Sequence, residues 1–141
     1  MAMRAPNKHG VFEEPEVALM VGEQVRDFCT VLVAEWKDGW RWSYSMACGF
    51  PNTGACAPSW LPMMSQKPFS SRRLAVAVAI EELAARLAEM ERCQVRWSHG
   101  SWRRDEHLAV ARRARALLKR FSSVADQVTG PRQLSLFGEV A

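Results

Sequence analysis

Two β-prone runs, residues 28–36 and 40–48, are separated by the tripeptide Lys-Asp-Gly at residues 37–39. Both runs are rich in β-branched and aromatic residues, which pack well on a pleated sheet. An Asp-Gly pair favours a two-residue turn between strands because glycine adopts a positive φ at little cost. The pattern therefore predicts an antiparallel β-hairpin over about residues 28–48.

A turn at the Asp-Gly pair sets the register of this hairpin. It places Trp36 opposite Arg41, where a cation–π contact is expected, and Cys29 opposite Cys48. One face carries most of the large apolar side chains: Val31, Val33, Glu35, Trp40, Trp42, Tyr44 and Met46. The other face carries Thr30, Leu32, Ala34, Trp36, Arg41, Ser43 and Ser45. We expect the first face to meet the hydrophobic core.

Farther along the chain, apolar residues recur at helical spacing in two segments. The first helix is predicted over about residues 71–92, capped by Ser70 or Ser71, with the stripe Val76, Ile80, Leu83, Leu87 and Met90. A break is expected over residues 94–100. The second helix is predicted over about residues 102–127, with the stripe Leu108, Ala111, Ala114, Leu118, Phe121 and Ala125. We expect the first helix to lie across the apolar face of the hairpin.

The segment before the hairpin, residues 14–27, fits two periodicities. Val17, Leu19 and Val21 alternate as in a strand. A helical stripe is also present, formed by Val17, Met20, Val21, Val25 and Phe28. We favour the helix, although Gly22 counts against it.

These elements predict an α+β fold, in which a β-hairpin or small antiparallel sheet packs against two C-terminal helices. The 141 residues suit a single domain. We expect a flexible leader over residues 1–13, one domain over 14–128 with a long loop at 49–69, and a tail over 129–141.

Charge is distributed unevenly along the chain. The formal net charge is +4, but residues 92–120 alone carry nine basic and two acidic residues, and the remainder is slightly acidic. Such a basic segment suggests an anionic partner, most commonly DNA or RNA. The candidate phosphate contacts are Arg103, Arg104, Arg112, Arg113, Arg115, Lys119 and Arg120. The alternative is a solvated helix face.

The sequence offers little catalytic chemistry. The four cysteines include no Cys-x-x-Cys pair, and the three histidines have no metal-ligand spacing to them. There is no phosphate-binding glycine loop and no nucleophile elbow. We therefore expect no enzyme activity, metal or cofactor, and we expect free thiols. With no apolar run near 18 residues and no apolar N-terminal signal, we expect a cytoplasmic protein that does not bind membranes.

The tail contains the most specific motif, Gln133-Leu134-Ser135-Leu136-Phe137. It resembles the pentapeptide with which bacterial replication and repair proteins bind the DNA polymerase III sliding clamp (the β clamp). The pattern of that family is Gln, Leu, Ser or Asp, Leu, Phe, and all five positions match. Ordinary residue frequencies give such a match by chance in roughly one chain of this length in several thousand.

The resemblance implies a small accessory or inhibitory protein of bacterial, plasmid or phage origin. It further implies that Leu136 and Phe137 fill a hydrophobic pocket on the clamp and that Leu134 packs at its edge. The amide of Gln133 fixes the register, whereas Ser135 is partly exposed. A contact this small should bind with a Kd on the order of micromolar. The basic helix is then expected to touch the DNA that threads the clamp.

Two other hypotheses remain open from the sequence. In one, the tail packs on its own domain and the protein is a nucleic-acid-binding module. Its basic helix would hold phosphates, and Trp40, Trp42 and Tyr44 would stack on single-stranded bases unless the first helix covers them. In the other, the chain is an adaptor that homodimerises through its two apolar-striped helices.

Overall fold

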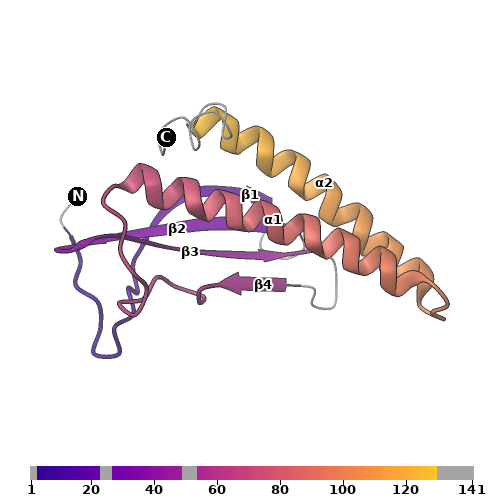
Figure 1. Ribbon diagram of the computed structural model, residues 1–141, viewed down its shortest axis with the longest axis horizontal. Coiled ribbons are helices and arrows are strands. Elements are labelled where there is room, and N and C mark those ends of the chain that lie inside the picture. The colour runs from indigo at the N-terminus through magenta and orange to yellow at the C-terminus, as the bar shows by residue number, and fades with distance from the viewer. Residues whose placement is uncertain (1–2, 23–26, 49–53, 130–141) are drawn as a thin grey trace.

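The computed structural model describes residues 3–22, 27–48 and 54–129 and forms a four-stranded sheet with two helices (Figure 1). The elements are β1 (Glu16–Gly22), β2 (Phe28–Trp36), β3 (Gly39–Ala47), β4 (Gly54–Ala57), α1 (Arg72–Ser98) and α2 (Arg104–Thr129). The strands follow one another in the order β1-β2-β3-β4, and every neighbouring pair is antiparallel. The predicted α+β fold is confirmed. The predicted hairpin is its centre, and β1 and β4 flank it.

β1 corrects the helix that we favoured for this segment. Leu19 and Val21 are buried in the core, opposite Val31 and Cys29 of β2. The register shifts between Val17 and Leu19, so the strand contains an irregularity that blurs its alternation. Pairing with β2 therefore outweighs the helical periodicity.

The β2–β3 turn lies one residue earlier than predicted. Trp36 pairs with Gly39, so the turn residues are Lys37 and Asp38. Arg41 therefore lies opposite Ala34, and the predicted contact between Trp36 and Arg41 is wrong. The Nζ atom of Lys37 instead lies 5.2 Å from the centre of the Trp36 ring.

The same change alters the cysteine pairing but not the two faces. Cys29 lies opposite Met46 rather than Cys48. Because every partner moves by two residues, each side chain stays on its predicted face. Val31, Val33, Trp42, Tyr44 and Met46 are buried on the core face, as predicted.

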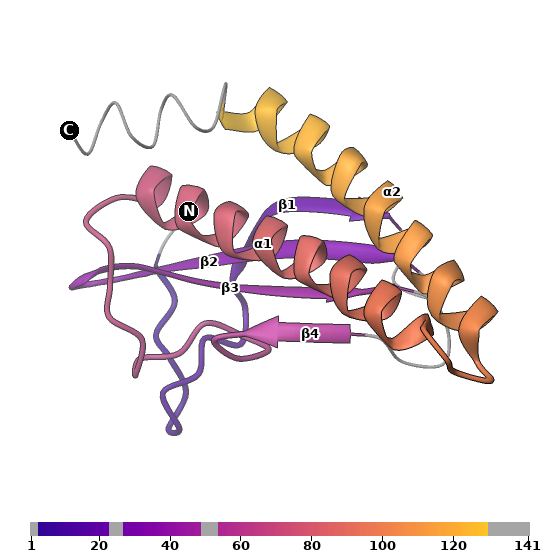
Figure 2. The same ribbon diagram turned by 45° about the vertical axis from the view of Figure 1, so that its right-hand side comes forward.

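Both helices cover this face of the sheet (Figure 2). α1 lies over β2 and β3, whereas α2 lies mainly over β1. The predicted stripe of α1 is buried throughout, and Ser71 caps the helix by accepting a hydrogen bond from the Leu74 backbone N–H at 3.2 Å. On α2, Leu117 is buried in addition to the predicted Phe121, whereas Leu118 is only half-buried. The core thus forms between the helix pair and one sheet face.

α1 continues to Ser98, through most of the segment predicted as a break. The apolar stripe stops at Met90, and the next buried positions on that side are the polar residues Gln94 and Ser98. Both have partners: Gln94 Oε1 lies 2.8 Å from His107 Nδ1 of α2, and Ser98 Oγ donates to the Val95 carbonyl at 2.6 Å. Satisfied polar groups therefore extend a helix that hydrophobic periodicity no longer marks.

The opposite face of the sheet is closed by polar contacts around Arg41. Its side chain is almost fully buried and donates two hydrogen bonds to the carboxylate of Asp38, at 2.7 and 2.8 Å. Its Nε donates to the Gln66 carbonyl at 2.9 Å. Arg41 therefore joins the β2–β3 turn to the segment that leads into α1.

Candidate functional site

The predicted clamp-binding peptide, Gln133-Leu134-Ser135-Leu136-Phe137, lies outside the described residues. The last residue of α2 is Thr129, so the peptide starts four positions after the end of that helix. In the sequence, residues 130–132 separate the peptide from the basic helix.

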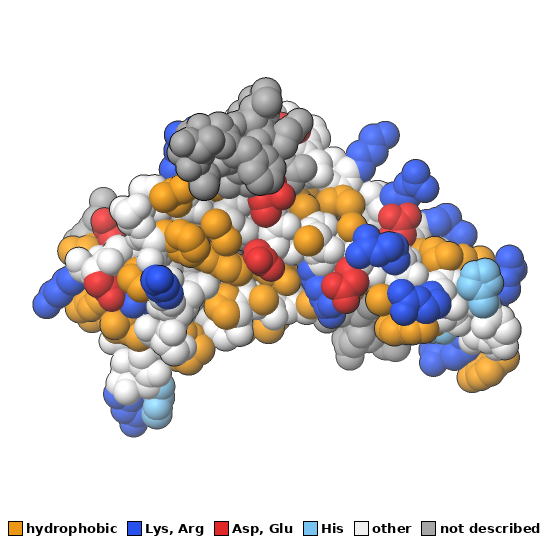
Figure 3. All heavy atoms as spheres, viewed as in Figure 1, with side chains coloured by type: hydrophobic (Ala, Val, Ile, Leu, Met, Phe, Trp, Pro, Cys, Tyr) orange, Lys and Arg blue, Asp and Glu red, His pale blue; other side chains and the backbone are white. Residues whose placement is uncertain are grey.

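The seven predicted basic residues divide into three groups along α2. Arg103 and Arg104 lie at its start and are exposed. Arg112, Arg115 and Lys119 are also exposed and follow one another at helical spacings of three and four residues. Such spacing places them along one side of the helix. Figure 3 shows Lys and Arg side chains along the outer surface of α2.

The third group, Arg113 and Arg120, lies closer to the sheet. The Nε of Arg113 is 3.8 Å from a carboxylate oxygen of Asp27, which precedes β2. Arg120 is near enough to lower the pKa of the buried Cys29 thiol, against the larger effect of burial. These two cations are therefore less suited to an extended ligand than the outer group.

Several of the exposed cations have weak ion-pair partners. Arg103 pairs with Glu106 at 2.7 Å, and Arg115 lies 3.9 Å from Glu91. For Arg112 and Lys119, the described residues provide no ion pair. Because exposed ion pairs contribute little stability, a phosphate can replace the carboxylates at small cost. The outer side of α2 is thus a candidate anion-binding surface.

The aromatic residues of the sheet do not provide a base-stacking surface. Trp42 and Tyr44 lie in the core under α1, with ring centres 6.2 Å apart and nearly parallel planes. Trp40 is half-buried and packs against the same core. The hypothesis that these rings stack on single-stranded bases is therefore wrong.

Two exposed tryptophans lie instead at the junction of the helices. Trp97 is 54% exposed and Trp102 is 91% exposed. We call residues 92–104, which connect the two helices and include their facing ends, the helical tip. The sequence did contain a signal for it, because this stretch holds two tryptophans and four arginines without an acidic residue.

The cysteines are free thiols, as predicted. Cys29 and Cys48 are buried, and burial raises the pKa of each thiol to about 12. A thiol with so high a pKa has almost no thiolate at neutral pH. These two residues therefore act as apolar packing groups rather than nucleophiles.

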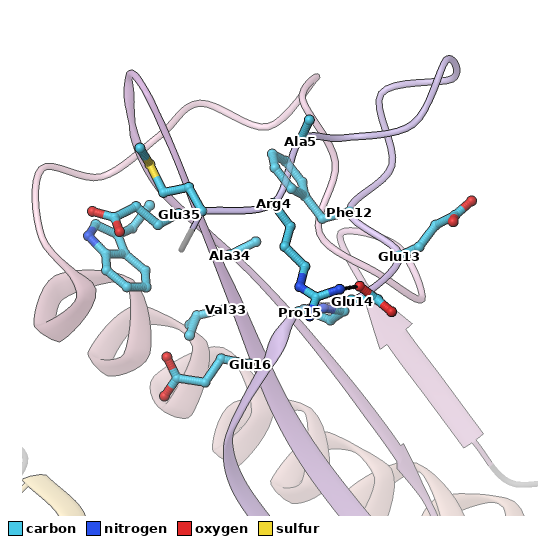
Figure 4. Close-up of a pocket in the computed structure, with 12 residues that line it drawn as sticks. Arg4, Ala5, Phe12, Glu13, Glu14, Pro15, Glu16, Val33, Ala34 and Glu35 are labelled. Carbon is cyan, nitrogen blue, oxygen red and sulfur yellow. Dashed lines mark hydrogen bonds and ion pairs between the residues drawn. The ribbon is translucent and has the colours of Figure 1, made fainter. Parts of the chain in front are cut away.

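A pocket of about 320 Å³ lies between the N-terminal segment and the end of β2 (Figure 4). Four glutamates contribute to its lining: Glu13, Glu14, Glu16 and Glu35. Three of them have partners, since Glu14 pairs with Arg4, Glu16 pairs with Arg72, and Glu13 accepts a hydrogen bond from Asn7. Because most of its carboxylates are already bound, we assign no ligand to this pocket.

The described residues contain no cluster of three or more histidine, cysteine, aspartate or glutamate side chains that could hold a metal ion. Neither helix is both long and apolar enough to cross a membrane, over the same part of the chain. No protein-family model, curated protein sequence or solved structure matches this chain. The candidate sites must therefore be judged on their own chemistry.

Proposed function

We propose that this protein is a non-enzymatic accessory or inhibitory protein that binds the bacterial DNA polymerase sliding clamp. The observation that carries the proposal is the complete match of Gln133-Leu134-Ser135-Leu136-Phe137 to the clamp-binding pattern. In that role, Leu136 and Phe137 anchor the peptide in an apolar pocket and Gln133 sets its register by hydrogen bonding. The α+β body is the part that such a peptide delivers to, or keeps away from, replicating DNA.

The position of the peptide relative to α2 supports a second contact with DNA. Four residues span at most about 14 Å, which limits how far Gln133 lies from Thr129. Lys119 lies about 15 Å up the helix from the same residue, at 1.5 Å per residue. A clamp-bound peptide therefore keeps the cations of α2 close to the clamp and to the DNA inside it. Linking two weak contacts in this way raises the overall affinity.

The direct test is calorimetric titration of the full chain into a purified bacterial sliding clamp. We expect a Kd on the order of micromolar for the wild type. Leu136→Ala/Phe137→Ala should weaken binding at least 100-fold, because two anchor side chains are lost. Ser135→Ala is the matched control within the same peptide, and it should bind almost as the wild type does. Absence of wild-type binding would refute the proposal.

A second candidate function is nucleic-acid binding by α2 without the clamp. The exposed Arg112, Arg115 and Lys119 along one side of the helix favour it. Arg112→Glu/Lys119→Glu should then weaken binding to duplex DNA and reduce its dependence on salt. The same variant separates two forms of the first proposal. A recruited body needs these cations, whereas a pure competitor for the clamp retains its full inhibitory effect without them.

A further inference from the structure

The helical tip lies outside the hydrophobic core. On α1, the last buried apolar residue is Met90, and on α2 the first is Ala111. α1 has 27 residues and is therefore about 40 Å long, whereas the nine-residue strands span about 30 Å. Figures 1 and 2 both show the joined ends of the helices extending past the strands. The tip thus projects from the body of the protein.

The connection at the tip is ordered by its own hydrogen bonds. The backbone N–H of Ser101 donates to the Ser98 carbonyl at 3.3 Å, and the Ser101 hydroxyl accepts from the Arg103 N–H at 3.0 Å. Between them, Gly100 has a φ of +71°, a conformation that favours glycine. The Gln94–His107 contact joins the two helices just behind this turn. The tip therefore holds its side chains on a defined framework.

Large apolar side chains are exposed on this framework. Trp102 is 91% exposed, Trp97 is 54% exposed and Val95 is 40% exposed. The ring of Trp97 meets His107 edge-on, with ring centres 6.3 Å apart. The guanidinium of Arg103 lies 5.5 Å from the centre of the Trp102 ring. Neither indole is buried in the core, and large apolar side chains exposed close together in this way are typical of an interaction surface.

The charged side chains of the helical tip itself are all basic. Within residues 92–104, the charged side chains are Arg92, Arg96, Arg103 and Arg104, and all four are exposed. Acidic residues border this stretch on both sides, and each has a cationic partner: Glu91 lies near Arg115, Asp105 near Arg104, and Glu106 near Arg103. Figure 3 shows hydrophobic, basic and histidine side chains gathered at this end of the molecule. Indole rings among guanidinium groups match a ligand with flat π-faces and regular negative charge.

We propose that the helical tip binds single-stranded nucleic acid. Trp102 and Trp97 stack on unpaired bases, and Arg92, Arg96 and Arg104 contact the phosphates on either side. A second copy of the chain fits this surface poorly, because two tips would bring eight arginines together. The stacking requires bases that are free of a duplex, which distinguishes the tip from the phosphate-binding side of α2. This proposal does not depend on clamp binding.

The test is fluorescence anisotropy of the full chain with labelled oligo-dT and oligo-rU of about 15 nucleotides, without any clamp present. Trp102→Ala should weaken binding roughly five- to 100-fold, whereas Trp102→Phe should retain most of it because a stacking ring remains. Trp60→Ala is the matched control, since Trp60 is 61% exposed but lies in the segment before α1. Comparing the two oligomers shows whether the 2′-hydroxyl and the 5-methyl group together change the affinity.

A second arm tests the charges. Arg92→Gln/Arg96→Gln should lower the slope of log affinity against log salt by about 1.4, the value for two phosphate contacts on a single strand. Leu136→Ala/Phe137→Ala should bind both oligomers normally, so a failed clamp experiment leaves this result intact. Because Trp102 is almost fully exposed, its variants should fold as the wild type does, which circular dichroism verifies.

Three results would overturn the proposal. One is no binding of either oligomer at low salt. Another is binding that Trp102→Ala and Trp60→Ala weaken equally. The third is a tip-dependent association of a different kind, seen as Trp102-dependent self-association in sedimentation or as Trp102-dependent binding to anionic phospholipid vesicles with no oligomer binding.

Discussion

Over the sheet, the two helices bury Leu83, Leu87 and Phe121 completely, whereas at the helical tip Trp97 and Trp102 remain in water. The two regions belong to the same pair of helices and differ in what they face. Above the sheet, each apolar side chain has a surface to cover. Beyond Met90, the buried positions of α1 are the polar residues Gln94 and Ser98, and Gln94 contacts His107 of α2. Exposed tryptophans on such a framework indicate binding rather than folding.

The largest expected effect is on the free energy of unfolding, which should respond differently to substitutions in the core and at the helical tip. Phe121→Ala should lower the free energy of unfolding by about 3–5 kcal/mol, because it leaves a cavity between α2 and the sheet. Trp102→Ala should change it by less than about 0.5 kcal/mol, because the indole is exposed. Urea denaturation of both variants measures the difference. A loss of stability in Trp102→Ala close to that of Phe121→Ala would mean that the tip belongs to the core.

A smaller effect is expected on the opposite face of the sheet, at Asp38. Its two hydrogen bonds from Arg41 hold the pKa of the Asp38 carboxyl below its usual value. Such a group stabilises the fold above its ordinary pKa, and the contribution is lost as the pH falls through the lowered value. Asp38→Asn should therefore be less stable than the wild type at neutral pH, by less than Phe121→Ala. The free energies of unfolding of Asp38→Asn and the wild type should converge as the pH falls below about 4. A difference that persists undiminished at pH 2 would contradict this assignment.

The smallest expected effect is a difference in the rates at which the four cysteine thiols are alkylated. Iodoacetamide at pH 8 should modify the exposed Cys56 first and the half-buried Cys93, beside the helical tip, more slowly. Cys29 and Cys48 should stay unmodified, since a pKa of about 12 lowers their thiolate fraction about 1,000-fold even before access is considered. Peptide mass spectrometry gives the order. Early modification of Cys29 would show that the core between the sheet and the helices becomes accessible to solvent more readily than its burial indicates.

Much of the sheet's packing could be predicted from alternation, but its turn could not. Gly39 looked like a turn residue, yet it is the first residue of β3, with a φ of +133°. A Cβ atom there would lie 2.4 Å from the Phe69 carbonyl oxygen. The glycine is therefore required by a close approach from a segment 30 residues away. The residues next to Gly39 in the sequence do not indicate this contact with Phe69.

The candidate site was predictable to a similar degree. Charge counting found the basic helix because the cations are dense along the sequence. For Trp42 and Tyr44, the sequence leaves base stacking open unless the first helix covers them, and α1 does cover them. It does not single out Trp97 and Trp102, which are exposed. Both lie where the helices extend past the sheet (Figure 1), next to the contact between Gln94 of α1 and His107 of α2. A contact between two elements cannot be seen in the periodicity of either.

Three different contacts occupy the backbone hydrogen-bonding groups along the edge of β3 that faces away from β2. β4 pairs only with Tyr44–Ala47, the last four residues of the strand. The Trp42 N–H donates to the Gln66 side chain at 2.7 Å, and Trp40 exchanges two backbone hydrogen bonds with Phe69 at 2.7 and 2.8 Å. A nine-residue strand thus offers a neighbouring molecule no continuous ladder of backbone groups on that side. Edge-to-edge polymerisation through β3 is therefore blocked by β4, by one amide side chain and by the backbone pairing of Trp40 with Phe69.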